Sequence, residues 1–188
     1  MVGRIRDRGH DGGHYWRWLT IEKFVRKNGW TKGVELGVWR GETFKHVVKT
    51  CKDLNMIGVD LYAAQPESTG PEKWTPGENG HAWDHDRYYQ DMLNFCSKYP
   101  ERASIIKDYT TEAAKMFEDE HFDFVFIDAD HSYEGVMRDV EAWTPKIRKG
   151  GYIIGHDIHF PTVMKAVNEL YGNDYNREDD FIWWVERQ

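Results

Sequence analysis

The chain has 188 residues, a formal net charge of −7 and a pI of about 5.7. This length suits one globular domain, so residues 1–188 are expected to fold as a single unit. The acidic balance argues against a broad basic face, so long nucleic acids are not expected as partners. Cys51 and Cys96 form neither a metal-binding spacing nor a disulfide framework, and both are expected to stay reduced, as in a cytoplasm. The charged N-terminal sequence has no apolar run, so neither a signal peptide nor a membrane span is expected.

Apolar residues with helical or buried-strand periodicity alternate along most of the chain. Residues 1–13 are polar and rich in glycine, and are expected to form a loose arm. Helices are expected at 14–28, 43–52, 85–98, 110–118, 133–143 and 161–171. Strands are expected at 34–36, 56–60, 103–108, 122–130, 150–157 and 181–187. Thr110 or Thr111 offers a hydroxyl that can cap the helix beginning there.

Residues 63–84 interrupt this alternation. They contain three prolines, three glycines and two tryptophans, so they are too polar for a core and too aromatic for a simple linker. Long loops of this kind in compact domains are often functional, and we expect an inserted lid over a small-molecule site. A disordered insertion is the alternative interpretation.

The alternation of strands and helices predicts an α/β fold: a doubly wound, mostly parallel, Rossmann-like sheet with helices on both faces. In such sheets, ligands bind beyond the carboxyl ends of the strands. Acids, histidines and a glycine turn fall at five predicted strand ends, namely Glu35–Gly41, Asp60, Asp108, Asp128–His131 and His156–Asp157. Their convergence on one edge predicts a binding site there.

The stretch "GVELGVWRGETF", residues 33–44, has the pattern of a strand, a tight turn and the start of a helix. Its glycines, Gly37 and Gly41 with Trp39 between them, depart from the G-x-G-x-x-G dinucleotide fingerprint. Glu35 would be a poor partner for a phosphate, whereas Asp60 can accept both hydroxyls of a ribose. A ligand with a ribose, an amine, a carboxylate and no phosphate fits this combination, and S-adenosylmethionine has all four properties.

The sequence resembles class I S-adenosylmethionine-dependent methyltransferases, in the branch of the catechol, caffeoyl-CoA and macrolide-sugar O-methyltransferases. Three segments carry the resemblance: "ELGVWRGET", "IGVDLY" and "FDFVFIDADHSYEGVMRDVEAWTPKIRKGGYIIGHD". It covers roughly residues 15–185, apart from the loop at 63–84. The resemblance implies transfer of a methyl group from S-adenosylmethionine to a small-molecule acceptor, with a hydroxyl group favoured.

The resemblance also implies roles in binding the cofactor. Five residues would surround its methionine end: Glu35, Gly37, Trp39, Gly41 and Thr43. Asp60 would hold the ribose and Leu61 would pack on the adenine, which Asp108 and Tyr109 would border. Asp108 could instead cap a helix, and Thr43 could be an ordinary first-turn residue.

Metal-dependent members of this branch hold magnesium with an acid after the fourth strand and an acid–amide pair after the fifth. Asp128 matches the first position, but His156 and Asp157 stand where the acid–amide pair is usual. Magnesium prefers oxygen ligands, and histidine favours a transition metal or indicates that no metal binds. A divalent metal such as magnesium or manganese at Asp128, His156 and Asp157 is therefore left open as a second cofactor.

His131 lies three residues after Asp128, where the catechol branch places a lysine base. Imidazole can take a proton at neutral pH, so His131 is predicted to be the general base, with Asp128 beside it. A helix cap or a place near the metal is the alternative for His131. Two other functions remain open: a non-catalytic S-adenosylmethionine-binding module and a nucleotide-binding oxidoreductase. The acceptor and the oligomeric state, including a homodimer, are not determined by the sequence.

Overall fold

A computed structural model describes residues 16–63 and 84–188, so the predicted arm at 1–13 and nearly all of the predicted lid lie outside the described residues. Its helices are α1 (Arg17–Asn28), α2 (Glu42–Thr50), α3 (His85–Cys96), α4 (Thr110–Ala114), α5 (Tyr133–Trp143) and α6 (Pro161–Tyr171). Its strands are β1 (Lys32–Leu36), β2 (Asn55–Asp60), β3 (Ala103–Lys107), β4 (Phe122–Ile127), β5 (Ile147–Gly155), β6 (Asn176–Arg177) and β7 (Trp183–Glu186). A single 3₁₀ turn at Thr144–Lys146 joins α5 to β5.

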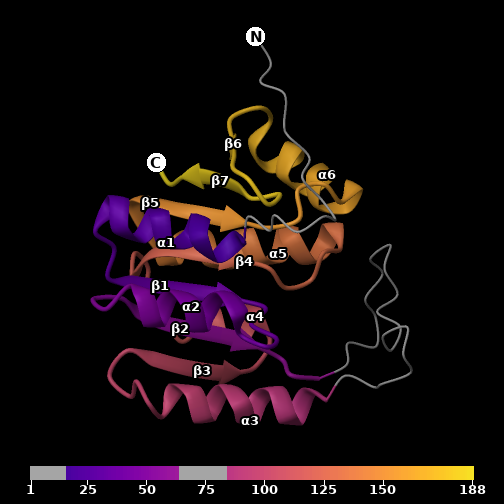
Figure 1. Ribbon diagram of the computed structural model, residues 1–188. Coiled ribbons are helices and arrows are strands. Elements are labelled where there is room, and N and C mark those ends of the chain that lie inside the picture. The colour runs from indigo at the N-terminus through magenta and orange to yellow at the C-terminus, as the bar shows by residue number, and fades with distance from the viewer. Residues whose placement is uncertain (1–15, 64–83) are drawn as a thin grey trace.

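The strands form one seven-stranded sheet in the order β3-β2-β1-β4-β5-β7-β6. The first five strands of this order pair in parallel, while β7 runs antiparallel to both β5 and β6. The arrowheads of β1 to β5 consequently point to the same edge of the sheet (Figure 1). This arrangement confirms the predicted doubly wound, mostly parallel α/β fold.

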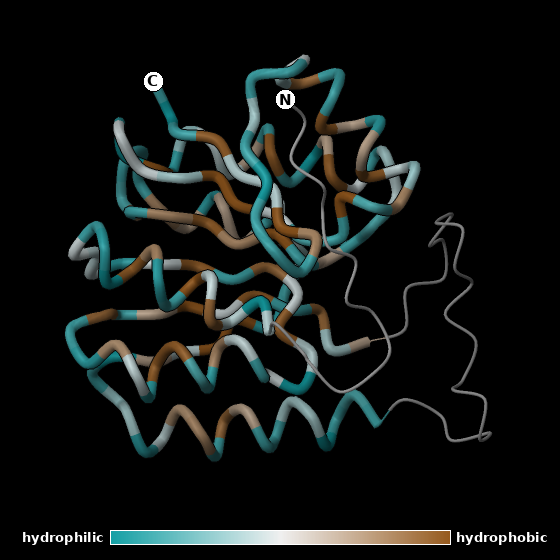
Figure 2. Tube along the Cα trace, turned by 45° about the horizontal axis from the view of Figure 1, so that its top comes forward, coloured by the Kyte–Doolittle hydropathy of each residue, from teal (hydrophilic) through white to brown (hydrophobic). Residues whose placement is uncertain are grey.

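Two apolar cores lie on opposite faces of the sheet because successive side chains of a strand point to opposite sides. In β4, Phe124 and Phe126 join the core beneath α1, α2 and α3, whereas Val125 and Ile127 join the core beneath α4, α5 and α6. Figure 2 shows the strands as a largely hydrophobic layer between helices of mixed colour. A sheet buried on both faces explains why β4 is a continuous apolar run.

Some element boundaries differ from the sequence prediction. Helix α4 ends at Ala114 rather than at 118, because Phe117 turns back to pack on Phe122 and Trp143, with ring centroids 4.9 and 5.9 Å away. The predicted Thr cap is wrong: Tyr109 is the N-cap residue of α4 and has no side-chain cap bond. Within 16–63 and 84–188, no helix has the length and apolarity that a membrane crossing requires.

Candidate functional site

The predicted site residues gather at the edge where the parallel strands end. Hydrogen bonds continue the sheet by one residue past β1, β4 and β5. They fix the first residue after each of these strands at the edge that we call the rim. Gly37 N donates to the carbonyl of Val59 at 2.9 Å, and Asp128 N donates to that of Leu36 at 2.8 Å. His156 N likewise donates to the carbonyl of Ile127 at 3.0 Å. The backbone positions of Gly37, Asp128 and His156 are therefore set by the sheet itself.

The glycine turn after β1 depends on backbone conformations that favour glycine. Gly37 has φ 81°, and a Cβ added there would overlap the backbone of Asp128 and Ala129. Gly41 has φ 73°, and a Cβ there would overlap the side chain of Met92 on α3. Substituting either residue would strain the backbone and force its neighbours apart. The turn thus lies directly against the end of β4.

Asp60, at the end of β2, organises this turn through its carboxylate. Its Oδ2 accepts the Trp39 N–H at 2.7 Å, and its Oδ1 accepts the Tyr62 N–H at 2.7 Å. Trp39 and Tyr62 both have positive φ, 49° and 44°, a conformation unusual for residues other than glycine. Asp60 therefore holds two backbone segments with unusual conformations, one at Trp39 and one at Tyr62.

Glu35 is the most deeply buried acid of the site. Its side chain is 2% exposed, and its Oε2 has no hydrogen-bond partner among the described residues. Burial is the main reason that its pKa lies well above the usual range; the charges of Asp128 and Asp60 raise it further, while Arg17 opposes them. A buried carboxyl without a partner is costly, and a cationic ligand group would compensate for that cost.

We expect Glu35→Gln to separate binding from stability. Because the pKa of Glu35 is raised in the folded protein, its ionisation destabilises the fold as the pH rises above the unfolded-state value. The neutral variant should therefore melt at a higher temperature than the wild type, and the gap should widen from about pH 5 to about pH 8. Its affinity for S-adenosylmethionine should fall by a factor of about three to ten, because a neutral amide is a weaker acceptor for the ligand's ammonium group than a carboxylate.

Calorimetric titration and thermal melts of the same samples measure both effects. Glu42→Gln is the matched control, since Glu42 is an exposed acid in the first turn of α2. If Glu35→Gln binds S-adenosylmethionine with wild-type affinity, Glu35 does not contact the donor.

The other predicted cofactor residues lie on the same edge with different degrees of exposure. Thr43 is 1% exposed, and its hydroxyl has no partner among the described residues. Leu61 and Asp108 are half-buried, whereas Tyr109 is 57% exposed. Asp108 caps no helix through its side chain, because its Oδ1 accepts the N–H of Tyr109 instead. The structure therefore brings Glu35, Gly37, Trp39, Gly41, Thr43, Asp60, Leu61, Asp108 and Tyr109 to the ends of β1, β2 and β3.

A cluster of acids and histidines occupies the ends of β4 and β5. His131 Nε2 lies 3.1 Å from Asp157 Oδ2 and 3.5 Å from Asp128 Oδ1. One ligand atom from each of these three residues fits within a group whose members all lie within 4.8 Å of one another. Asp157 reaches this position with φ 56°, so the backbone is strained where its carboxylate turns into the cluster.

His156 approaches the same two acids from the β5 side. Its Nδ1 lies 3.4 Å from Asp128 Oδ1 and 3.2 Å from Asp157 Oδ1. Neither of its ring nitrogens has a partner with hydrogen-bond geometry among the described residues, although its side chain is only 9% exposed. The side chains of Asp128, His131, His156 and Asp157 thus converge at short range, but Nε2 of His131 and both ring nitrogens of His156 lack good hydrogen bonds among the described residues. A cation or a proton shared between them would pair these groups.

The charges of this cluster shift each other's protonation. Burial disfavours the imidazolium of His156, but Asp128 and Asp157 outweigh that effect and raise its pKa to about 10. Burial likewise opposes the raised pKa of His131, which Asp128 and Asp157 favour. For Asp128, burial is outweighed by His131, His156 and Arg17, so its pKa falls well below the usual range. Asp128 is therefore the fixed negative charge of the cluster.

Sequence reasoning missed two residues that hold this cluster. Arg17, the first residue of α1, places its Nε 3.2 Å from Asp128 Oδ2. The backbone N–H of Arg17 donates to Asp180 Oδ2 at 2.6 Å, and that same oxygen lies 3.9 Å from His156 Nε2. Arg17 and Asp180 lie far from Asp128 in the sequence and belong to no motif, so no local signal identified them.

Solved structures of several methyltransferases resemble this fold. The O-methyltransferase NovP superimposes with a TM-score of 0.65 at 19% identity, covering 92% of this chain and 79% of that one. The calicheamicin methyltransferase CalS11 gives 0.67 at 14% identity, with 90% and 78% covered. The SAH-bound methyltransferase PaMTH1 of Podospora anserina gives 0.63 at 11% identity, with 94% and 80% covered. At these identities the likeness concerns the fold.

Sequence comparisons extend the likeness. The chain is 28% identical over 143 residues to the uncharacterized protein R132 of Acanthamoeba polyphaga mimivirus. The match covers 73% of this chain but only 58% of the length of that relative. A family model described as a methyltransferase domain matches residues 34–158, from β1 through the acid–histidine cluster after β5. This match confirms the predicted resemblance: the chain belongs to the methyltransferase domain family.

Proposed function

We propose that the protein transfers the methyl group of S-adenosylmethionine to a hydroxyl group of a small-molecule acceptor. The observation that carries the proposal is the contact between two parts of the rim. The backbone at Gly37, in the predicted methionine-binding turn, lies directly against Asp128 and Ala129 at the end of β4. A donor held by that turn would have its reactive end beside the cluster of Asp128, His131 and Asp157.

The charges of the donor side suit S-adenosylmethionine. Glu35 is buried with an unpartnered oxygen, and its acidic neighbours favour a cationic ligand over a phosphate. Each carboxylate oxygen of Asp60 accepts one backbone N–H and keeps a lone pair for a ribose hydroxyl. The similarity to an SAH-bound methyltransferase supports the same donor.

The chemical step is an in-line displacement on a sulfonium carbon, for which the protein must align the reactants and remove the acceptor's proton. His131 is the proposed base because its Nε2 faces the shared space and has no hydrogen-bond partner among the described residues. Asp128 and Asp157 lie 3.5 and 3.1 Å from the same nitrogen and stabilise the imidazolium that forms. Because, against the effect of burial, they also raise the pKa of His131, the ring can take the proton only where the pH is high enough to leave it neutral. The O-methyltransferase NovP among the similar structures supports an oxygen acceptor.

The residues present also fit a divalent metal. Asp128, Asp157 and His131 supply one nitrogen and two carboxylate groups at close range, and His156 faces the same acids. When bound, the ion would act as a Lewis acid that lowers the pKa of the acceptor hydroxyl. This donor set differs from the predicted one by including His131, whose Nε2 would then bind the ion instead of taking the acceptor's proton. An imidazole ligand favours a transition metal over magnesium.

The alternative of a non-catalytic binding module is tested by turnover. The wild-type protein is incubated with methyl-labelled S-adenosylmethionine and a panel of acceptors carrying phenol, catechol or sugar hydroxyls, with and without manganese. The proposal expects transfer of label to at least one hydroxyl acceptor and clearly slower transfer by Asp60→Ala at low donor concentration. Binding of the donor without transfer to any acceptor class would favour the module. The match to a methyltransferase domain gives no support to an oxidoreductase.

A further inference from the structure

A buried carboxyl group on α5 lies outside the rim cluster and has no part in the proposed chemistry. Asp139 is 3% exposed, and its Oδ1 accepts a hydrogen bond of 2.5 Å from the Thr110 hydroxyl. One turn further along the same face of α5, Trp143 Nε1 donates to the carbonyl of Thr110 at 3.1 Å. Helix α5 therefore holds Thr110 by both its side chain and its backbone.

Burying the carboxyl group of Asp139 carries a desolvation cost that the hydrogen bond from Thr110 partly offsets. Burial raises the pKa of Asp139 to about 7; Asp130 raises it too, while the Thr110 hydroxyl and Arg138 act in the opposite direction. Asp130 is itself engaged by Ser132, whose N–H and hydroxyl donate to its two oxygens, and it lies 3.5 Å from Arg138. An apolar side chain at 139 would avoid this desolvation but could not hold Thr110.

Thr110 is the first residue of α4 and directly follows Asp108 and Tyr109. Helix α4 has only five residues and no side-chain N-cap, so its own hydrogen bonds fix its start weakly. The preceding pair is held locally by the bond from the Tyr109 N–H to Asp108 Oδ1. The pairing of Lys107 with Asp60 holds the chain just before this segment, and the contact with α5 adds a second tie at Thr110 that links residues 108–110 to the other side of the protein.

We propose that Asp139 is a positioning residue for the methyl donor: by holding Thr110, it fixes the 108–110 segment against which the adenine binds. The inference rests on the proposed function, because the adenine position is part of it. Asp139 touches no ligand, and it acts through Thr110 on Asp108 and Tyr109. Its removal should loosen the adenine side of the pocket and leave the acid–histidine cluster of β4 and β5 in place.

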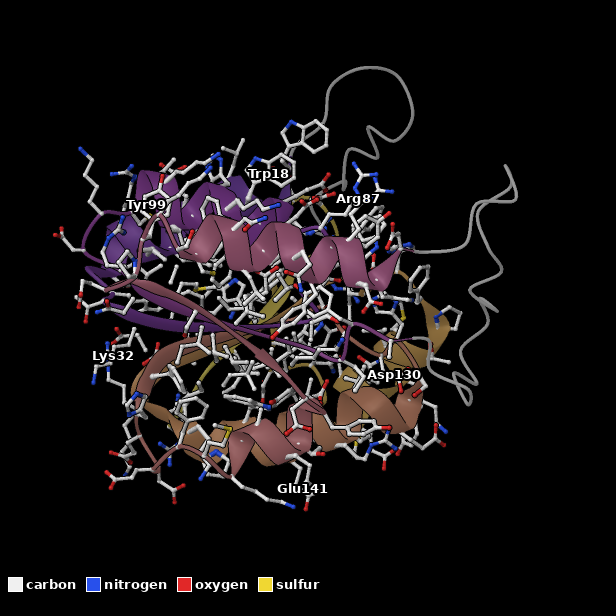
Figure 3. All side chains as sticks on the ribbon, turned by 90° about the horizontal axis from the view of Figure 1, so that it is seen from below. Trp18, Lys32, Arg87, Tyr99, Asp130 and Glu141 are labelled. Carbon is white, nitrogen blue, oxygen red and sulfur yellow. The ribbon has the colours of Figure 1, made fainter. Side chains whose placement is uncertain are left out.

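The test is calorimetric titration of S-adenosylmethionine into four variants of the contact and one control variant. Thr110→Val removes the hydroxyl and keeps the branched shape, and Asp139→Ala removes its acceptor. Each should weaken binding about three- to tenfold, and the double variant should be no weaker than the worse single one, because both break the same bond. Asp139→Asn keeps an acceptor oxygen and should stay near the wild type. Glu141→Gln, an exposed acid on the same helix at the periphery in Figure 3, is the matched control.

Two further readouts separate positioning from simple loss of structure. The donor KM should rise in Thr110→Val while kcat stays near the wild-type value. The affinity should also increase from about pH 6 to about pH 8, as the carboxylate of Asp139 forms and accepts a stronger bond. Because Glu35 also has a raised pKa, the comparison is made in the Glu35→Gln background, where adding Asp139→Asn should remove the dependence.

The outcomes are distinct. A wild type that binds no S-adenosylmethionine would refute the proposed function itself. If the wild type binds S-adenosylmethionine and folded Thr110→Val binds it with the same affinity, the role of Asp139 is overturned and the proposed function stays intact. Additive losses in the double variant would also contradict it, because they would show that the two residues act separately.

Discussion

Replacement of His131 with alanine is expected to lower turnover roughly a hundredfold or more, the usual range for a lost general base. His131 Nε2 faces Asp157 and Asp128 at 3.1 and 3.5 Å, and the backbone of Asp128 lies against Gly37 in the turn proposed to hold the donor. The donor affinity should change little, because no predicted cofactor contact involves His131. Turnover and calorimetric affinity are measured on the same preparation, with an acceptor found in the screen.

Chelator and metal distinguish the two forms of this prediction. If the protein works without a metal, chelator should leave wild-type turnover unchanged. The His131→Ala variant should then show the full loss of turnover with or without chelator. If a metal takes part, chelator should abolish wild-type turnover and manganese should restore it. His159→Ala is a useful control, because His159 contacts Asp157 at 3.6 Å but is the more exposed histidine. Full activity of His131→Ala in the presence of chelator would contradict both forms.

The Asp60→Ala variant should weaken S-adenosylmethionine binding by more than about tenfold. Two charge-assisted bonds to the ribose would be lost, and the N–H groups of Trp39 and Tyr62 would lose their acceptor. The glycine turn should loosen as well, since Asp60 holds its strained residue Trp39. The loss of affinity would therefore combine a direct effect, the missing ribose contacts, with an indirect effect, the loosened glycine turn.

Asp60→Asn helps to separate these parts, because it keeps one acceptor oxygen but carries no charge. It should bind more tightly than Asp60→Ala and more weakly than the wild type. Asp53→Ala serves as the surface control, since Asp53 is exposed and precedes β2 at the opposite edge of the sheet. An Asp60→Ala variant with unchanged affinity would count strongly against the donor assignment.

The fold and one edge of the site could be predicted because they depend on local patterns. Continuous apolar runs such as 122–127 identify buried strands, and acids placed directly after such runs must share one edge. The short strand β6 could not be found this way, because both of its residues, Asn176 and Arg177, are exposed and polar and are in the strand only by pairing with β7. Helix α4 was predicted too long because Phe117 has a helical spacing but packs back on the sheet side.

The predicted site was incomplete where tertiary contacts decide it. His131 and His156 were both identified, but only the structure places His131 in the compact group with Asp128 and Asp157. Arg17 and Asp180 reach this cluster from the two ends of the chain, which no spacing rule connects. Thr110 or Thr111 was predicted to cap the helix that begins there, whereas the Thr110 hydroxyl bonds to Asp139, 29 residues further along the chain. Long-range pairing of polar side chains is therefore the information that periodicity does not contain.

The central claim is that this edge of the sheet binds S-adenosylmethionine. Isothermal titration of the wild-type protein with S-adenosylmethionine, S-adenosylhomocysteine and NAD tests it most directly. The expected result is saturable binding of the first two ligands at one shared site, competition between them, and no binding of NAD. Binding of NAD, or failure of both adenosyl ligands to bind to a folded protein, would contradict the assignment.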